Sequence, residues 1–226
     1  MNAIAIILGI VIIILFFVLY KYYTNTATQL TSSNLINLNI DQTGNVITKV
    51  SSPTNNQFSY GIWVYVNSWG QGTPKTLFQH QNVLKVYLDP NSPKLYIDVN
   101  TGSTVTTTQI TDNFPIQKWV FIIVSVDTSF SDVYLDGKLI KSVKITNINT
   151  LPPTPSIYLG NNNPFTSFDA YVTCFYRWTI PMDPGTAWNY YMKGNGQNGL
   201  LGSLSPYGVK MQVLQNNVET ASYNLM

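Results

Sequence analysis

An apolar stretch in the middle of the chain limits its fold more than any other feature. Residues 119–126, WVFIIVSV, contain one polar side chain, that of Ser125. This length is too short for a typical buried helix and suits a strand covered on both faces. A second apolar stretch at 133–135 leads into Asp136-Gly137, the strongest short signal for a hairpin turn. With residues 138–145 as a third strand, the sequence predicts an antiparallel meander at the centre of the fold.

Further strands are predicted on both sides of this meander. Residues 58–66, FSYGIWVYV, are largely apolar on both alternating faces, as expected inside a sandwich. Other candidate strands lie at 76–80, 83–88, 94–99, 104–110, 156–160 and 165–180. Short strands at this spacing are typical of an all-β sandwich or barrel. One soluble helix is predicted at 183–193, with Asp183 as its N-cap and Pro184 in its first turn.

The domain organisation follows from these elements. We expect a membrane anchor at 1–23, a polar linker at 24–34 and a β-sandwich at 35–226. Within the sandwich, the core is placed at 57–193, and a closing hairpin at 207–225 is expected to pair near residues 35–50.

The N-terminal segment predicts a single-pass transmembrane helix. Residues 3–20 carry no charge and would span about 27 Å as a helix, close to the hydrocarbon thickness of a lipid bilayer. A cleaved signal peptide is the alternative, but the basic start and the Ala-x-Ala-like site of such peptides are missing. The anchor positions that we single out are Ala3, Leu8, Ile13, Phe17, Tyr20 and Lys21. Lys21 and the lack of any Asn-x-Ser/Thr site favour a cytosolic orientation of the following domain.

Composition argues against several classes of function. Charged residues make up 10% of the chain, and its lysines are scattered, so a nucleic-acid partner is not expected. Glycoside cleavage needs two facing carboxyl groups, yet Glu219 is the only glutamate, and Asp132 and Asp136 are only a weak match. We therefore predict no enzymatic activity and no catalytic residues.

Metal and cysteine chemistry are also not expected. Asp89 with Asn91, and Asp98 with Asn100, could each donate two oxygen ligands to Ca²⁺, but both pairs are better explained as turn formers. Cys174 is the single cysteine and is predicted to be a buried apolar side chain. No metal and no cofactor is predicted.

The order of these strands resembles a known family. The segments Phe58-Ser-Tyr-Gly-Ile-Trp-Val, Trp119-Val-Phe, Val133-Tyr-Leu-Asp-Gly-Lys138 and Ile157-Tyr-Leu-Gly160, followed by a late strand and a short helix, resemble the concanavalin A-like, laminin-G-like jelly roll. Together with the N-terminal anchor and the cysteine-poor composition, they also resemble membrane-anchored lectin-like proteins of large DNA viruses. The resemblance implies an all-β jelly roll preceded by a transmembrane helix, and a minor capsid role.

Two functions are carried forward from the sequence. The first is a non-enzymatic structural protein that tethers the inner membrane of a virion to its capsid, with the bilayer and other capsid or membrane proteins as partners. The alternative is a lectin-like module that binds a glycan. Its contacts would need an aromatic platform with polar groups, for which the candidates are Trp69, Asn161, Asn162 and Phe165.

Overall fold

The computed structural model describes most of the chain. The described residues are 3–24, 27–31, 34–42, 44–70, 72–102, 104–146, 148, 150–161, 164–195, 210–215 and 218–224. Side chains are described at 8–17, at Leu19 and, with the same gaps, between 27 and 195.

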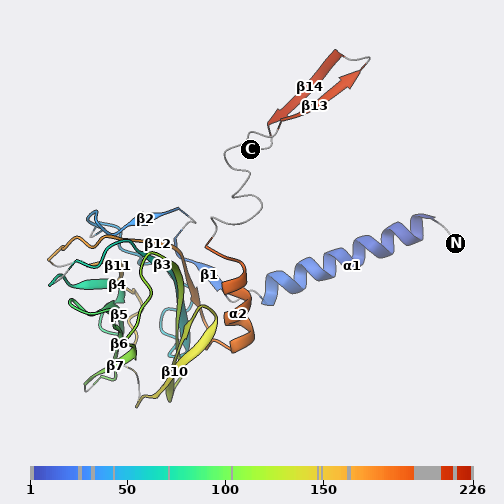
Figure 1. Cartoon of the computed structure of the whole chain (residues 1–226). Coiled ribbons are helices and arrows are strands. Elements are labelled where there is room, and N and C mark those ends of the chain that lie inside the picture. The colour runs from blue at the N-terminus through green and yellow to red at the C-terminus, as the bar shows by residue number, and fades with distance from the viewer. Residues whose placement is uncertain are drawn as a thin grey trace.

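The described elements are two helices and a series of short strands (Figure 1). The helices are α1 (Ala3–Thr24) and α2 (Pro184–Met192). The strands are β1 (Ala27–Gln29), β2 (Ile36–Asn37), β3 (Phe58–Val66), β4 (Lys75–His80), β5 (Leu84–Leu88), β6 (Leu95–Asn100), β7 (Val105–Thr111), β8 (Trp119–Val126), β9 (Phe130–Leu135), β10 (Lys138–Lys144), β11 (Ile157–Leu159), β12 (Ala170–Trp178), β13 (Lys210–Gln215) and β14 (Val218–Asn224).

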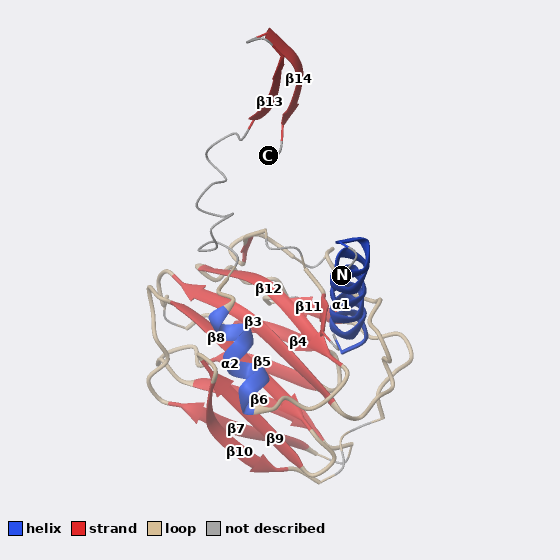
Figure 2. Cartoon of the chain, turned by 90° about the vertical axis from the view of Figure 1, so that its right-hand side faces the viewer, coloured by secondary structure: helices blue, strands red, loops and turns tan. Residues whose placement is uncertain are grey.

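Two antiparallel sheets pack face to face, which confirms the predicted all-β sandwich (Figure 2). The larger sheet has the order β1-β12-β3-β8-β9-β10, with β2 also paired to β12. The smaller sheet has the order β11-β4-β5-β6-β7. The predicted meander is β8, β9 and β10, which are neighbours in the larger sheet. The main hydrophobic core fills the space between the two sheets.

Strand β3 shows how the sequence specifies this core. It lies between β12 and β8, so both of its edges are hydrogen-bonded. Its alternate residues Phe58, Tyr60 and Ile62 are fully buried in the core between the sheets, whereas Trp63 points into a second apolar cluster on the other face. A strand covered on both faces needs the near-continuous apolar sequence found here.

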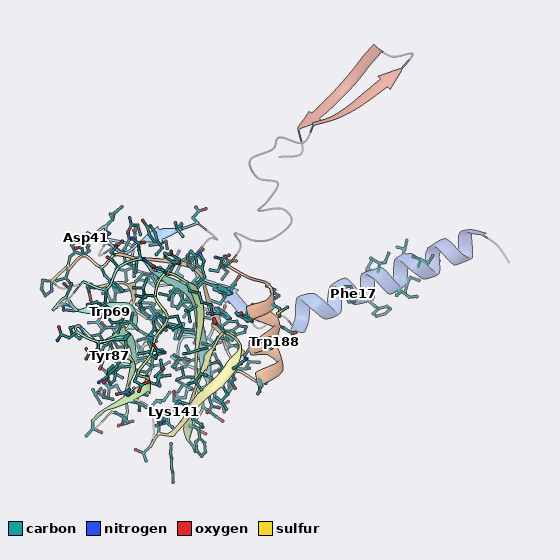
Figure 3. All side chains as sticks on the ribbon, viewed as in Figure 1. Phe17, Asp41, Trp69, Tyr87, Lys141 and Trp188 are labelled. Atoms are coloured by element: carbon teal, nitrogen blue, oxygen red, sulfur yellow. The ribbon has the colours of Figure 1, made fainter. Side chains whose placement is uncertain are left out.

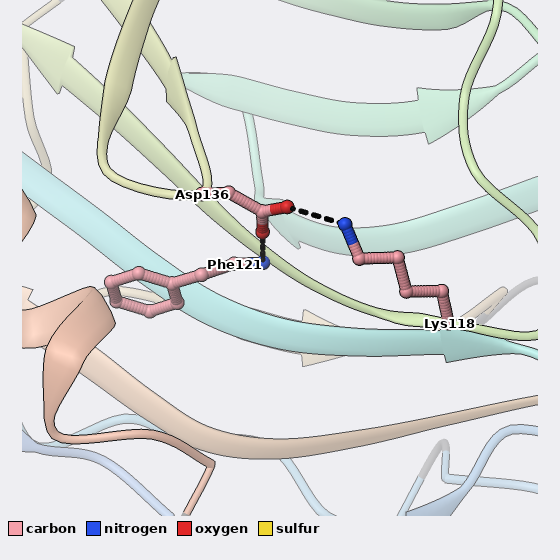
Figure 4. A network of polar contacts seen from close by, with 3 residues as sticks. All are labelled: Lys118, Phe121 and Asp136. Atoms are coloured by element: carbon pink, nitrogen blue, oxygen red, sulfur yellow. Dashed lines mark hydrogen bonds and ion pairs between the residues drawn. The ribbon is translucent and has the colours of Figure 1, made fainter.

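The hairpin between β9 and β10 has the predicted tight turn. Asp136 and Gly137 both have positive φ, 49° and 75°, which a type I′ turn requires. The Asp136 carboxylate accepts a hydrogen bond from the backbone N–H of Phe121 at 2.9 Å and forms an ion pair with Lys118 at 3.2 Å (Figure 4). The turn is therefore tied to the start of β8.

Helix α2 confirms the predicted soluble helix and its caps. The Asp183 carboxylate accepts a hydrogen bond from the backbone N–H of Thr186, and Pro184 occupies the first turn. Gly194, with a φ of 74°, follows the helix and donates its N–H to the carbonyl of Tyr191. The helix packs its Ala187 face on the outer side of the larger sheet.

Several predicted boundaries differ from the structure. The strand predicted at 165–180 begins at Ala170. The C-terminal hairpin β13–β14 forms a separate two-stranded sheet and does not pair near residues 35–50. Ile36 and Asn37 pair with β12 instead, because β12 has a partly free edge beside β1.

The predicted membrane anchor is wrong. Among the described residues, no helix has enough length and apolar character to cross a membrane. The side chains of α1 that the structure describes are those at 8–17 and that of Leu19. Leu8, Ile13 and Phe17 lie exposed among them, whereas the side chains of Ala3, Tyr20 and Lys21 lie outside the described ones. The location in a virion inner membrane, which depended on this anchor, is therefore also wrong.

Candidate functional site

The outer faces of the two sheets differ in what covers them. The outer face of the larger sheet is covered by α2 through an aromatic cluster that includes Trp63, Phe121, Tyr134 and Trp178. Among the described elements, none lies on the outer face of the smaller sheet, and both helices lie on the other side of the sandwich (Figure 1). The smaller sheet therefore presents its side chains directly to solvent.

Polar and aromatic side chains occupy this open face in rows set by the strand register. One row runs across the sheet through Tyr158, Gln79, Lys85, Asp98 and Thr107. The alternate residues, such as Val86 and Ile97, point into the core.

A second row lies beside the first. It contains Thr76, Tyr87, Tyr96 and Gln109. Because side chains alternate between the faces of a strand, residues two apart in sequence belong to neighbouring rows of one surface.

Two hollows meet on this face. The first has a volume of about 180 Å³ and is lined by residues that include Asn82, Asp98 and Asn100. The second has a volume of about 240 Å³, and its lining includes Thr76, Asn161 and Thr166. Gln79 and Lys85 line both hollows. The two hollows together form a polar depression that crosses β4 and β5.

Hydrogen bonds hold the carboxylate of Asp98 in place at one side of this depression. Its Oδ1 atom accepts hydrogen bonds from the hydroxyls of Tyr87 at 3.1 Å and Thr107 at 2.7 Å. Lys85 lies opposite Asp98 in the strand register, yet among the described residues the only ion pair joins Lys118 and Asp136. A carboxylate and an ammonium group therefore stand side by side without neutralising each other by direct contact.

Aromatic contacts border the depression. The rings of Tyr87 and Tyr96 stack with a centroid separation of 5.6 Å, and the Lys85 ammonium lies 4.9 Å from the centre of the Tyr87 ring. Burial, together with the neighbouring Asp98 charge, raises the pKa of Tyr87 to about 12. The Tyr87 hydroxyl therefore stays protonated at neutral pH and continues to donate to Asp98.

Trp69, a predicted platform, lies at the rim of the sandwich in a third hollow of about 190 Å³ (Figure 3). Asp169 and Ser68 line the same hollow, and the Ser68 hydroxyl donates to the Asp169 carboxylate at 2.6 Å. The Trp69 ring is half-buried, with the buried ammonium of Lys75 at 5.3 Å from its centre. The same ammonium donates to the carbonyls of Thr73 and Pro90. Trp69 therefore packs against a buried, hydrogen-bonded lysine in addition to lining the hollow.

Of the other three residues predicted to contact a glycan, the structure describes Asn161 and Phe165. Asn161 is buried, and its amide accepts from the Thr76 N–H and donates to the carbonyls of Pro74 and Thr166. It therefore ties two loops together, although it also lines the second hollow. Phe165 is exposed. Asn162 lies outside the described residues.

A buried polar group formed by Tyr60, His80 and Arg177 lies between the sheets, and His80 also lines the first hollow. The Tyr60 hydroxyl is 3.2 Å from Nδ1 of His80, and the Arg177 guanidinium lies 6.0 Å from the centre of the Tyr60 ring. Burial, together with the nearby Arg177 charge, lowers the pKa of His80 to about 4. Arg177 donates to the carbonyls of Ser51 and Ser52.

Of the residues considered as Ca²⁺ ligands, Asp89 and Asn100 have turn-forming roles, whereas Asp98, also expected to form a turn, lies within β6 and accepts from side-chain hydroxyls. Oδ1 of Asp89 accepts from the backbone N–H groups of Asn91 and Ser92, and Asn100 accepts from the N–H of Gly102. The part of the chain that the structure describes contains no group of three or more His, Cys, Asp or Glu side chains placed to hold a metal ion. Cys174 is buried, as predicted.

The open depression was not among the predicted sites. Its sequence signal is the alternation Lys85-x-Tyr87 on β5 and Tyr96-x-Asp98-x-Asn100 on β6, which places polar and aromatic side chains on one face. That alternation was visible, but it does not by itself indicate that the strands lie side by side.

Comparisons with known proteins agree with this architecture. The family model described as "Concanavalin A-like lectin/glucanases superfamily" matches residues 41–186. No curated protein matches the chain.

Three similar solved structures come from work on botulinum neurotoxins. They are the binding domain of neurotoxin DC in complex with rat synaptotagmin II (TM-score 0.54, 16% identity), the same domain in complex with SialylT (0.52, 17%), and a structure of neurotoxin type C, whose cell entry depends on interaction with two ganglioside molecules (0.51, 17%). Each match covers 66% of this chain and 39% of the other. At this identity the likeness shows the fold alone.

Proposed function

The chain belongs to the concanavalin A-like lectin/glucanase superfamily, and from this premise we propose that it is a carbohydrate-binding module. The ligand would lie in the depression on the outer face of the smaller sheet. The observation that carries this proposal is the meeting of two hollows at Gln79 and Lys85 on a face that no described element covers.

The chemistry of the depression suits sugar hydroxyls. Each hydroxyl both donates and accepts a hydrogen bond, and the amides of Gln79, Asn82 and Asn100 do the same. Lys85 supplies a donor and Asp98 an acceptor at neighbouring positions of the sheet, so the two can bracket adjacent hydroxyls of one ring. The described hydrogen bonds of Asp98 reach Oδ1, and none reaches Oδ2.

The proposal treats the chain as a binding module and not as an enzyme. Asp98 is the only carboxylate among the residues that line the two hollows, whereas glycoside cleavage ordinarily needs a pair. The capsid role expected from the sequence stays a prediction, since none of the matches described above is a capsid protein. Measurable turnover of β-glucans by the purified chain would contradict the non-enzymatic part of the proposal.

A glycan array probed with the full chain, followed by calorimetry on the strongest sugar, tests the proposal. We expect Lys85→Ala and Asp98→Asn each to weaken binding by about tenfold or more, because a hydrogen bond to a charged group contributes about 1.5–3 kcal/mol. Lys141→Ala, an exposed lysine of the other sheet, is the matched control and should bind like the parent chain. Absence of any array signal, or equal binding by Lys85→Ala, would overturn the proposal.

A further inference from the structure

Strand β10 forms a free edge of the larger sheet. It is hydrogen-bonded to β9, and among the described strands it has no second partner. Strand β7, the edge of the smaller sheet, contacts β10 without pairing to it. Half of the backbone donors and acceptors of β10 therefore face away from the sheet, as on any edge strand.

Apolar side chains next to this edge are unusually exposed. Leu139 is 49% exposed and Ile140 is 45% exposed on β10 itself. On α2, which contacts β10, Trp188 is 44% exposed and Met192 is 64% exposed. Trp188 lies over the hairpin turn, where a Cβ on Gly137 would be 3.0 Å from its ring (Figure 3). These four residues form what we call the edge patch.

Strand β7, an edge strand of the smaller sheet, provides a comparison within the same molecule. The centre of β7 carries threonine and glutamine at residues 106–109, which is the polar composition expected where an edge only has to avoid association. A need to avoid association does not explain the edge patch, because large exposed apolar side chains favour association.

Three exposed lysines give the edge strand β10 a positive charge, which limits the partners that can pair with it. Lys138, Lys141 and Lys144 are exposed along the strand, and none has a carboxylate within 4.0 Å among the described residues. Nearby acids are few: Asp132 faces Ser142 across the β9 pairing, and Asp136 is paired with Lys118. A second copy pairing edge to edge would bring these lysines together, which is destabilising. The bulge between Leu139 and Lys141 also disfavours self-pairing.

We propose that β10 is a docking edge for an extended acidic peptide of another protein. The peptide would add as a strand to the regular stretch 141–144, with its backbone completing the hydrogen-bond ladder. Its carboxylates would face Lys138 and Lys141, which the pairing with β9 places on one face of the strand, and its apolar side chains would lie on the other face, with Leu139 of the edge patch. Charge complementarity gives the specificity, and main-chain hydrogen bonds give the geometry.

Calorimetric titration of the full chain with synthetic peptides tests this proposal. We expect acetyl-Glu-Val-Glu-Val-Glu-Val-Glu-amide to bind, with affinity falling as salt is raised, because the contact depends on charge. The peptide with every valine replaced by proline should bind at least tenfold more weakly, because proline cannot donate to a strand ladder. Lys141→Glu should weaken binding at least tenfold, whereas Lys49→Glu, an exposed lysine far from β10 in sequence, should not.

A charge reversal completes the test. The chain with Lys138→Glu, Lys141→Glu and Lys144→Glu should lose the acidic peptide and gain the peptide in which lysine replaces glutamate. Near-ultraviolet circular dichroism of each variant checks that the sandwich is intact. Equal binding of the valine and proline peptides, no effect of the charge reversal, or no binding at all would overturn the proposal. None of these results depends on whether the smaller sheet binds sugars.

Discussion

The two outer faces of this sandwich differ in exposure, although both are formed by antiparallel strands. The face of the larger sheet carries Trp63, Phe121 and Trp178 and is buried under α2. The face of the smaller sheet carries Gln79, Lys85 and Asp98 and stays open. One face therefore contributes to stability as a second core, and the other is free to contribute to binding. Substitutions on the two faces should separate these contributions.

The largest difference is expected for an aromatic truncation on each face. Trp178→Ala should lower the free energy of unfolding by about 3–5 kcal/mol, because the side chain is fully buried against Tyr190 and Tyr176. Tyr96→Ala, which removes a stacked but solvent-facing ring, should cost about 1 kcal/mol or less. Urea denaturation followed by circular dichroism measures both. Equal losses would show that the open face is also a structural core.

Acid should destabilise the interior between the faces. The pKa of His80 is about 4 in the folded chain and about 6.5 when unfolded, so the unfolded state binds the proton more tightly. The stabilising effect is complete above about pH 6.5 and is lost as the pH falls toward 4, by about 3 kcal/mol.

Denaturation curves between pH 4 and pH 7 check this slope. His80→Gln is the control, because it removes the titrating ring and should flatten the curve over that range. Asp89, Asp127 and Asp183, whose pKa values are lowered by hydrogen bonds to their carboxylates, lose their contribution at more acidic pH. An unchanged slope in His80→Gln would contradict the prediction.

Close packing under α2 should also make the stability of the fold sensitive to substitution at one glycine. A Cβ on Gly61 would lie 2.8 Å from the Trp178 ring and 3.2 Å from that of Phe121, so Gly61→Ala should cost about 1–3 kcal/mol. Gly44→Ala is the matched control, because nothing lies within 4 Å of its Cβ position. Thermal unfolding of both variants measures the effect. Equal unfolding midpoints would mean that the aromatic side chains can shift to make room for the added methyl group.

The smallest effect concerns the cap of the covering helix. Asp183→Ala removes the acceptor for the Thr186 N–H and should cost about 1 kcal/mol, whereas Asp183→Asn should be close to neutral. Because α2 covers the aromatic face, we also expect Asp183→Ala to speed amide exchange in β9 more than in β5. The same exchange rates in both strands would show that the cover is not needed for local order.

Local features were predicted well from the sequence, and features that depend on distant pairing were not. The Asp136-Gly137 turn and the Asp183 cap each depend on a few adjacent residues, so their chemistry could be recognised directly. The open depression needs β4, β5 and β6 in register and brings Asn161 and Thr166 next to Thr76 and Gln79 of β4. Trp69 was recognised as an aromatic at a loop, but its contact with the buried Lys75 depends on a fold that the sequence pattern does not show.

The position of β3 also affects how the chain is made. Its partners are β8, about sixty residues later, and β12, more than a hundred residues later. During synthesis this largely apolar strand therefore leaves the ribosome long before either neighbour exists. Both edges of β3 are open to pairing with other nascent chains until β8 has emerged, and one edge stays open until Trp178 has emerged, so slow translation or a delayed release should favour aggregation over maturation.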